Sequence, residues 1–292
     1  MSLKGFKNTI LTNPIVGKEV LLKFRHKRFF WVASLYALIT FSSIAFFIYI
    51  YGDLAYRASD FITWLSQASK STFVFLTFWQ FTFISIITLS FTSAAITSEK
   101  EQNTLLLLFS SQLDAKMIIF GKFITAILHN ILTVLILLPV FSIIFILGGI
   151  SLAEVLYSAV LVILGTSLFA AVSIFCSTLF QKSIVANVVS SISALSLVFG
   201  PLIGPSIILE ILKFKKVSTI YLKDLLFFIP QHVNPVFPLV LLFEKGGITK
   251  GTILMHYSYT TIILSASCTI ISLILIFLLL STFILKRKIS KQ

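Results

Sequence analysis

The chain has 292 residues, of which 58% are hydrophobic and only 11% are charged, and its mean hydropathy is +1.04. Because ordinary soluble domains are about 25% charged, this composition excludes a water-soluble globular protein. The 23 Lys and Arg against 10 Asp and Glu give a net charge of +13, which we assign to membrane topology and attraction to anionic lipid rather than to nucleic-acid binding.

The N-terminal segment predicts an interfacial helix. Residues 1–28 carry seven Lys and Arg but no apolar region followed by a cleavage site, so no removable signal peptide is expected. Asn13 and Pro14 indicate a turn. The apolar and basic residues that follow, up to Arg28, are typical of an amphipathic helix lying at the membrane surface.

Six stretches contain no charged residue and are at least 24 residues long. Since about 20 apolar residues cross the hydrocarbon as a helix, we predict an all-α, polytopic membrane protein in which residues 1–292 form a single transmembrane domain. The six predicted spans cover residues 29–51, 72–97, 117–148, 153–180, 184–209 and 256–285. A β-barrel is not expected, because barrel strands are short and alternate between apolar and polar residues.

The distribution of positive charge predicts the orientation in the cell membrane. With the N-terminus inside, 15 Lys and Arg lie on the cytoplasmic side and eight lie outside. Short loops rich in Lys and Arg stay in the cytoplasm. Both termini are therefore expected to be cytoplasmic.

The loop between the second and third predicted spans is the most informative segment. Ser98 and Glu101 have the spacing of a capping box, which predicts a helix that begins at Ser98. Five large apolar residues then follow, from Leu105 to Phe109. An exposed apolar run next to an acidic helix indicates either docking of a partner, which we favour, or contact with lipid alone.

Prolines occur in two segments, one near the end of the fifth predicted span and one in the connection between the fifth and sixth spans. Pro201 and Pro205 predict either a hinge or the end of the fifth span. Between spans five and six, residues 225–243 are free of charge but contain three prolines. That segment is expected to be a re-entrant or interfacial cap rather than a seventh span.

No enzymatic motif is found along the chain. A GxxxxGK[ST] phosphate loop, an HExxH pair and a GxSxG elbow are all missing from the sequence. Cys176 and Cys268 lie in different spans without a second ligand at metal-binding spacing. We therefore expect no catalytic residue, no bound metal and no cofactor.

Three elements carry a resemblance to a known family. They are Asn13-Pro14 with Lys18-Glu19, the run from Ser98 to Leu105, and Gly121-Lys122. With these elements and its six-span layout, the chain resembles the permease subunit of type 2 ABC exporters. It departs from the family pattern at Asn103, where Gly is usual, and at Gln112, where Pro is common.

The resemblance implies that the loop forms a coupling helix seated in a cleft of a separate ABC ATP-binding subunit. The residues expected to make that contact are Glu99, Lys100, Glu101, Thr104, Leu105 and Leu108. It also implies a second permease subunit, in a homodimer or a heterodimer. The Phe- and Leu-rich spans are compatible with a hydrophobic substrate, and a non-transporting anchor, mechanotransmission or immunity subunit is the alternative.

Overall fold

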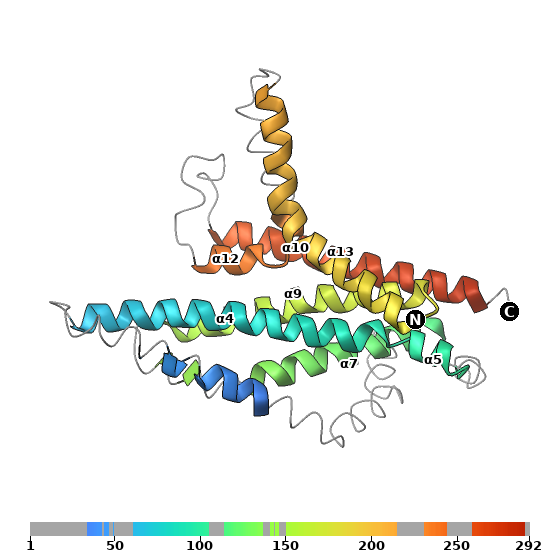
Figure 1. Ribbon diagram of the computed structural model, residues 1–292, viewed down its shortest axis with the longest axis horizontal. Coiled ribbons are helices and arrows are strands. Elements are labelled where there is room, and N and C mark those ends of the chain that lie inside the picture. Colours follow the sequence, from blue (N-terminus) through green and yellow to red (C-terminus); the bar gives the residue numbers. More distant parts are fainter. Residues whose placement is uncertain are drawn as a thin grey trace, which may run out of the picture. The chain divides into compact units, whose positions relative to one another are not determined.

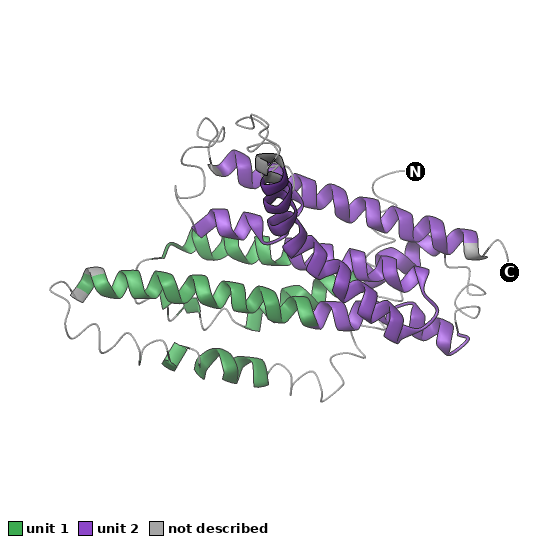
Figure 2. Cartoon of the chain, turned by 45° about the horizontal axis from the view of Figure 1, so that its top comes forward, with its two compact units in different colours: residues 1–86, 124–163 green, residues 87–123, 164–292 purple. Residues whose placement is uncertain are grey.

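The computed structural model describes residues 34–42, 44–46, 49, 61–104, 114–136, 141–142, 144–145, 150–214, 231–243 and 259–289. All regular structure in these ranges is helical, which confirms the predicted all-α class. Two compact units are present, residues 1–86 with 124–163 and residues 87–123 with 164–292 (Figure 2). The predicted interfacial helix, along with Leu105 and Leu108, lies outside the described residues.

The helices appear in Figure 1 with the following bounds: α4 Phe61–Ser93, α5 Thr97–Glu101, α7 Ala115–Ile136, α9 Leu152–Leu179, α10 Ser183–Phe214, α12 Phe237–Phe243 and α13 Tyr259–Ile289. Five segments are long and apolar enough to cross a membrane: Trp64–Glu101, Ala115–Ile136, Leu152–Leu179, Ser183–Ile208 and Thr260–Arg287. They correspond to the predicted spans two to six and make this a multi-pass membrane protein. At the predicted first span, Ser34–Phe46 is a shorter apolar helix, so a sixth crossing stays a prediction.

Helix α4 begins 11 residues before the predicted start of its span, at Phe61 rather than at residue 72. The prediction used Lys70 as a boundary, but a charged side chain limits only the depth of a helix in the bilayer. Lys70 is exposed. Its backbone continues the helix, since Lys is a good helix former.

Helix α10 runs through both of its prolines and ends at Phe214. Of the two sequence-based alternatives, a hinge and a helix end, the structure shows a bent but continuous helix. Figure 1 shows α10 changing direction near its middle. This bend is expected where prolines remove backbone hydrogen bonds.

Each unit has its own aromatic contacts. In the first unit, the rings of Tyr36 and Phe83 stack with centroids 4.0 Å apart. In the second unit, Phe175 of α9 lies 5.5 Å from Phe277 of α13. The part of α9 in this unit is lined by small buried residues, including Ala170 and Ala171, and small residues let neighbouring helices in a membrane approach closely.

Candidate functional site: the polar clamp around α5

The short helix α5 begins at Thr97, after a turn that follows α4. Its N-cap residue is Ile96, whose side chain makes no capping hydrogen bond. Ser177 of α9 supplies the acceptor instead: its Oγ accepts the backbone N–H groups of Ile96 at 2.9 Å and Thr97 at 3.0 Å. The predicted capping box of Ser98 and Glu101 is therefore wrong, because an acceptor 80 residues away in sequence takes its place.

Removal of the Ser177 hydroxyl should loosen α5. Ser177 is fully buried, so Ser177→Ala leaves two backbone N–H groups without their acceptor, at a cost of about 2 kcal/mol. We expect hydrogen exchange of the amides of residues 96–101 to become about thirtyfold faster. Ser196→Ala is the control, since the exposed Ser196 hydroxyl bonds only the carbonyl of Ser193. Equal exchange in wild type and Ser177→Ala would contradict the assigned role.

The other end of α5 is closed by a left-handed residue. Asn103 has φ 54°, the only non-glycine residue with positive φ in the part of the chain that the structure describes. The N–H of Asn103 donates to the carbonyl of Lys100 at 3.2 Å, and the N–H of Thr104 donates to that of Glu99 at 3.0 Å. This pair of bonds is the Schellman motif, in which the left-handed position is usually Gly and sometimes Asn.

The effect of an Asn103 substitution on the stability of α5 should therefore depend on how well the new residue tolerates a left-handed backbone, more than on its side-chain chemistry. A left-handed conformation costs most residues about 1–2 kcal/mol, and Gly and Asn tolerate it best. We expect Asn103→Val to raise local opening of α5 about tenfold and Asn103→Gly to leave it close to wild type, as measured by hydrogen exchange of residues 98–104. A Val variant that exchanges as slowly as the Gly variant would exclude this explanation.

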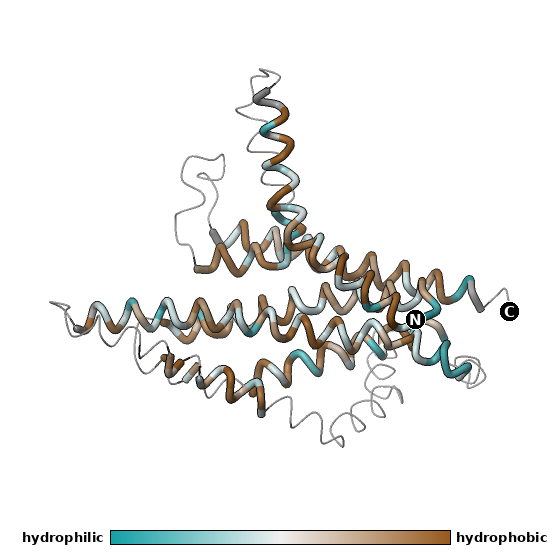
Figure 3. The backbone as a smooth tube through the Cα atoms, viewed as in Figure 1, coloured by the Kyte–Doolittle hydropathy of each residue, from teal (hydrophilic) through white to brown (hydrophobic). Residues whose placement is uncertain are grey.

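Three consecutive charged residues of α5 reach three different helices. Successive helical residues point about 100° apart, so Glu99, Lys100 and Glu101 together cover more than half of the helix circumference. Figure 3 shows α5 as a hydrophilic segment beside largely apolar helices. All three residues and their partners belong to the second unit.

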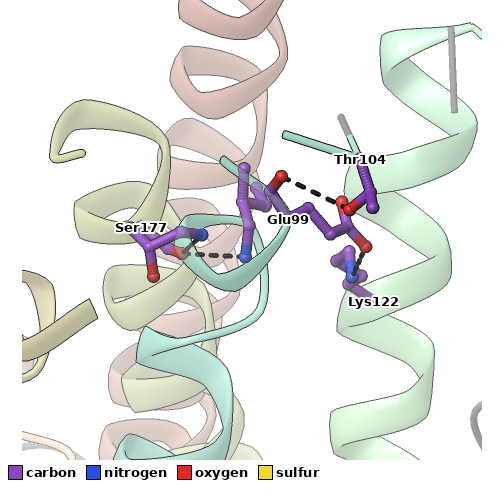
Figure 4. A network of polar contacts seen from close by, with 6 residues as sticks. Glu99, Thr104, Lys122 and Ser177 are labelled. Carbon is purple, nitrogen blue, oxygen red and sulfur yellow. Dashed lines mark hydrogen bonds and ion pairs between the residues drawn. The ribbon is translucent and has the colours of Figure 1, made fainter. Parts of the chain in front are cut away.

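Glu99 pairs with Lys122 of α7. The Lys122 Nζ lies 2.7 Å from Glu99 Oε1, and the side chains of Lys122 and Glu99 are 5% and 20% exposed (Figure 4). The other carboxylate oxygen, Oε2, is buried and accepts no hydrogen bond within the described residues. Because a buried charge without a counter-charge is costly, this carboxylate depends on Lys122.

Lys100 reaches the C-terminus of α9. Its ammonium group donates to three backbone carbonyls, those of Ser177 at 2.7 Å, Thr178 at 2.9 Å and Phe180 at 2.7 Å. The last carbonyls of a helix have no intrahelical donor and carry partial negative charge. The single cation of Lys100 therefore satisfies the end of α9 and ties it to α5.

Glu101 reaches the N-terminus of α10. Its Oε1 accepts the backbone N–H of Ser183 at 2.7 Å, and its Oε2 accepts the Ser183 hydroxyl at 2.9 Å. These two bonds satisfy both oxygens of the Glu101 carboxylate. A negative charge is favourable at the N-terminus of a helix, where backbone N–H groups lack intrahelical acceptors.

We call this set the α5 clamp: Glu99, Lys100, Glu101, Lys122, Ser177 and Ser183. Of the predicted contact residues, Glu99, Lys100 and Glu101 are brought together with Thr104, whose Oγ1 donates to the Glu99 carbonyl at 3.4 Å. Sequence reasoning noted Lys122 only as part of a motif and missed Ser177 and Ser183. Neither serine has a local signal, since their roles come from tertiary contacts.

Among the residues that the structure describes, no group of three or more His, Cys, Asp or Glu side chains could hold a metal ion. The α5 clamp holds the short helix α5 against three helices, α7, α9 and α10, through charged side chains.

The comparisons with known proteins point to a single family. Residues 55–283 match the family described as "ABC-2 family transporter protein". The matched range includes the whole α5 clamp. A comparison with curated proteins found no match.

Proposed function

The chain belongs to the ABC-2 transporter family as a membrane permease, and we propose that ATP hydrolysis on a separate subunit drives it to export a substrate. The observation that supports this proposal is the α5 clamp. A five-residue helix gains little stability by itself, yet here it is fixed by charged contacts to α7, α9 and α10. A helix fixed in this way can transmit force.

The six predicted coupling residues divide into two groups in this proposal. Glu99 and Lys100 hold α5 in place, because their charged groups are bonded inside the chain. Thr104, Leu105 and Leu108 would contact the ATP-binding subunit, with Glu101 at the edge of the contact. An apolar run beside a polar helix suits a cleft in a partner protein.

The proposed topology places α5 and both termini in the cytoplasm of a cell whose plasma or inner membrane holds the chain. The excess of Lys and Arg on that side supports this orientation. Family membership also supports assembly with a second permease subunit, identical or related. ATP-driven closure of the ATP-binding subunits would then shift the permease between inward- and outward-open states.

Purification of a tagged chain from its native membranes tests the docking proposal. We expect a protein with a phosphate-binding loop to copurify with the wild-type chain, and we expect the purified sample to have ATPase activity. Leu105→Asp together with Leu108→Asp should remove both, because charges placed in an apolar contact must be desolvated without a partner. Lys116→Met, a change at an exposed residue of α7, should retain both.

A charge exchange separates positioning from direct contact at Glu99. The double variant Glu99→Lys with Lys122→Glu restores an ion pair inside the chain but reverses the charge on α5. We expect it to keep the ATPase, whereas loss of the ATPase from a folded double variant would place Glu99 in the contact.

Failure of any ATPase to copurify with wild type would overturn the coupling proposal. In liposomes, stimulation of ATP hydrolysis by substrate would favour transport over a mechanical role.

A further inference from the structure

The two prolines of α10 leave two backbone carbonyls without their usual donors, those of Leu197 and Pro201, and the second lies in the bend. In an α-helix, the N–H of residue i+4 donates to the carbonyl of residue i. The donor for the Pro201 carbonyl would be residue 205, which is also proline and has no N–H. The carbonyl of Pro201 therefore has to be satisfied from outside the helix.

The segment before α12 provides that donor. Gln231 Nε2 donates to the Pro201 carbonyl at 3.3 Å, and Asn234 Nδ2 donates to the Val198 carbonyl, in the preceding turn, at 3.0 Å. Gln231 and Asn234 are 4% and 3% exposed. Two buried side-chain amides thus bind the bend itself.

The same segment is fixed to α13 on its other side. Thr269 Oγ1 donates to the carbonyl of His232 at 2.7 Å, and His232 Nε2 lies 3.0 Å from Ser265 Oγ. Helix α12 directly follows this segment, and its residues Phe237 and Leu241 pack in one apolar cluster with Ile262 and Ala266 of α13. The segment is therefore a fixed support against which α10 can be held.

Beyond Pro205, the side chains of α10 are exposed at residues 206–208, 210 and 211. Gly200 and Gly204 flank the prolines, and a Cβ added at either would meet nothing within 4 Å. Since Gly and Pro are the weakest helix formers and little packing covers this arm, the backbone of the bend has low resistance to a change of angle.

We propose that Gln231 and Asn234 form a latch that holds α10 in its bent state, and that release of this latch lets the arm beyond Pro205 change its angle. Pro201 and Pro205 are the hinge, and the segment fixed to α13 is its support. The latch acts inside the second unit and would operate whether or not α5 binds an ATPase.

Distances between spin labels on the full-length chain in lipid nanodiscs test the latch. In a background with Cys176→Ala and Cys268→Ser, labels replace the exposed residues Val188 and Ile208 on the two sides of the bend. A straight helix would separate these positions by about 30 Å. Gln231→Met keeps the size of the side chain and removes the amide. It should shift the equilibrium about fivefold away from the bent state, toward states in which the arm beyond Pro205 has another angle, because one hydrogen bond is lost.

A second background makes the result specific. Pro205→Ala restores the N–H that can donate to the Pro201 carbonyl, so Gln231→Met should then have no further effect on the distances. Ser272→Ala removes an exposed hydroxyl that bonds only inside α13, to the carbonyl of Thr269, and should leave the distances unchanged. The latch is refuted if Gln231→Met leaves the distances unchanged, if its effect is equal in the Pro205→Ala background, or if Ser272→Ala has the same effect. Size-exclusion profiles and helical circular dichroism confirm that each variant is folded.

Discussion

Lys122→Met should destabilise the second unit by about 3 kcal/mol, the usual cost of leaving one partner of a buried ion pair behind. The reason lies in Glu99, whose Oε1 is bonded to Lys122 while its Oε2 is buried without a donor in the described structure. Without Lys122, Oε1 of Glu99 would lose its ion pair, and the partly buried carboxylate would have no counter-charge from α7. Titration of the folded protein with SDS in mixed micelles measures the change in the free energy of unfolding.

Two further variants define the meaning of this result. Lys116→Met changes an exposed lysine on the same helix and should cost less than about 1 kcal/mol. Glu99→Gln combined with Lys122→Met removes both charges and should recover most of the lost stability, since a neutral pair often replaces a buried ion pair without loss. A double variant as unstable as Lys122→Met alone would show that packing of the lysine, not its charge, is what matters.

Lys100→Met should have an effect at least as large, about 3 kcal/mol or more, because a hydrogen bond to a charged group contributes about 1.5–3 kcal/mol and three end at this ammonium group. The carbonyls of Ser177, Thr178 and Phe180 would lose their common donor at the end of α9. Both the SDS titration and hydrogen exchange of α5 should report the loss.

Lys100→Arg should not restore the wild-type stability. The guanidinium group is planar and spreads its donors in a fork, whereas the three carbonyls converge on one tetrahedral nitrogen. Lys182→Met, at an exposed residue in the connection between α9 and α10, serves as the matched control and should change stability little. A fully stable Arg variant would show that positive charge alone is sufficient at this site.

Hydropathy predicted the helical class and five of the spans because long uncharged runs have few other stable structures in a membrane. The bounds of α9 differ from the prediction by one residue at each end, since Glu154 and Lys182 limit that run closely. The start of α4 was missed because its first turns contain polar residues that a helix end accepts. Hydropathy reports burial in lipid, not the length of the hydrogen-bonded helix.

The α5 clamp could be predicted only in part. The acidic and basic residues of α5 were identified as important, but their partners lie 23 to 82 positions away in sequence. Local rules assigned Ser98 and Glu101 to each other, but the Glu101 carboxylate accepts from Ser183 instead. Ser177 caps the helix start through the N–H groups of Ile96 and Thr97. Capping patterns describe isolated helices and fail where a neighbouring helix supplies the cap.

The departure at Asn103 from the family pattern has a physical explanation. The resemblance predicted Gly at this position, and the structure gives it a positive φ of 54°. Asn is the side-chain-bearing residue that best tolerates this region, together with Asp. The substitution therefore preserves the turn that ends α5, which comparison of the letters alone would not reveal.

The direct bonds of α5 to α7, α9 and α10 also work in the opposite direction. Binding equilibria that share a conformational change are coupled reciprocally, so each affects the other by the same factor. If a molecule bound within the membrane separates α7 from α9, it must strain the Glu99 and Lys100 contacts and so weaken or strengthen the grip of any protein on α5. Occupancy inside the bilayer and the binding of a protein to α5 would thus be coupled through one helical turn.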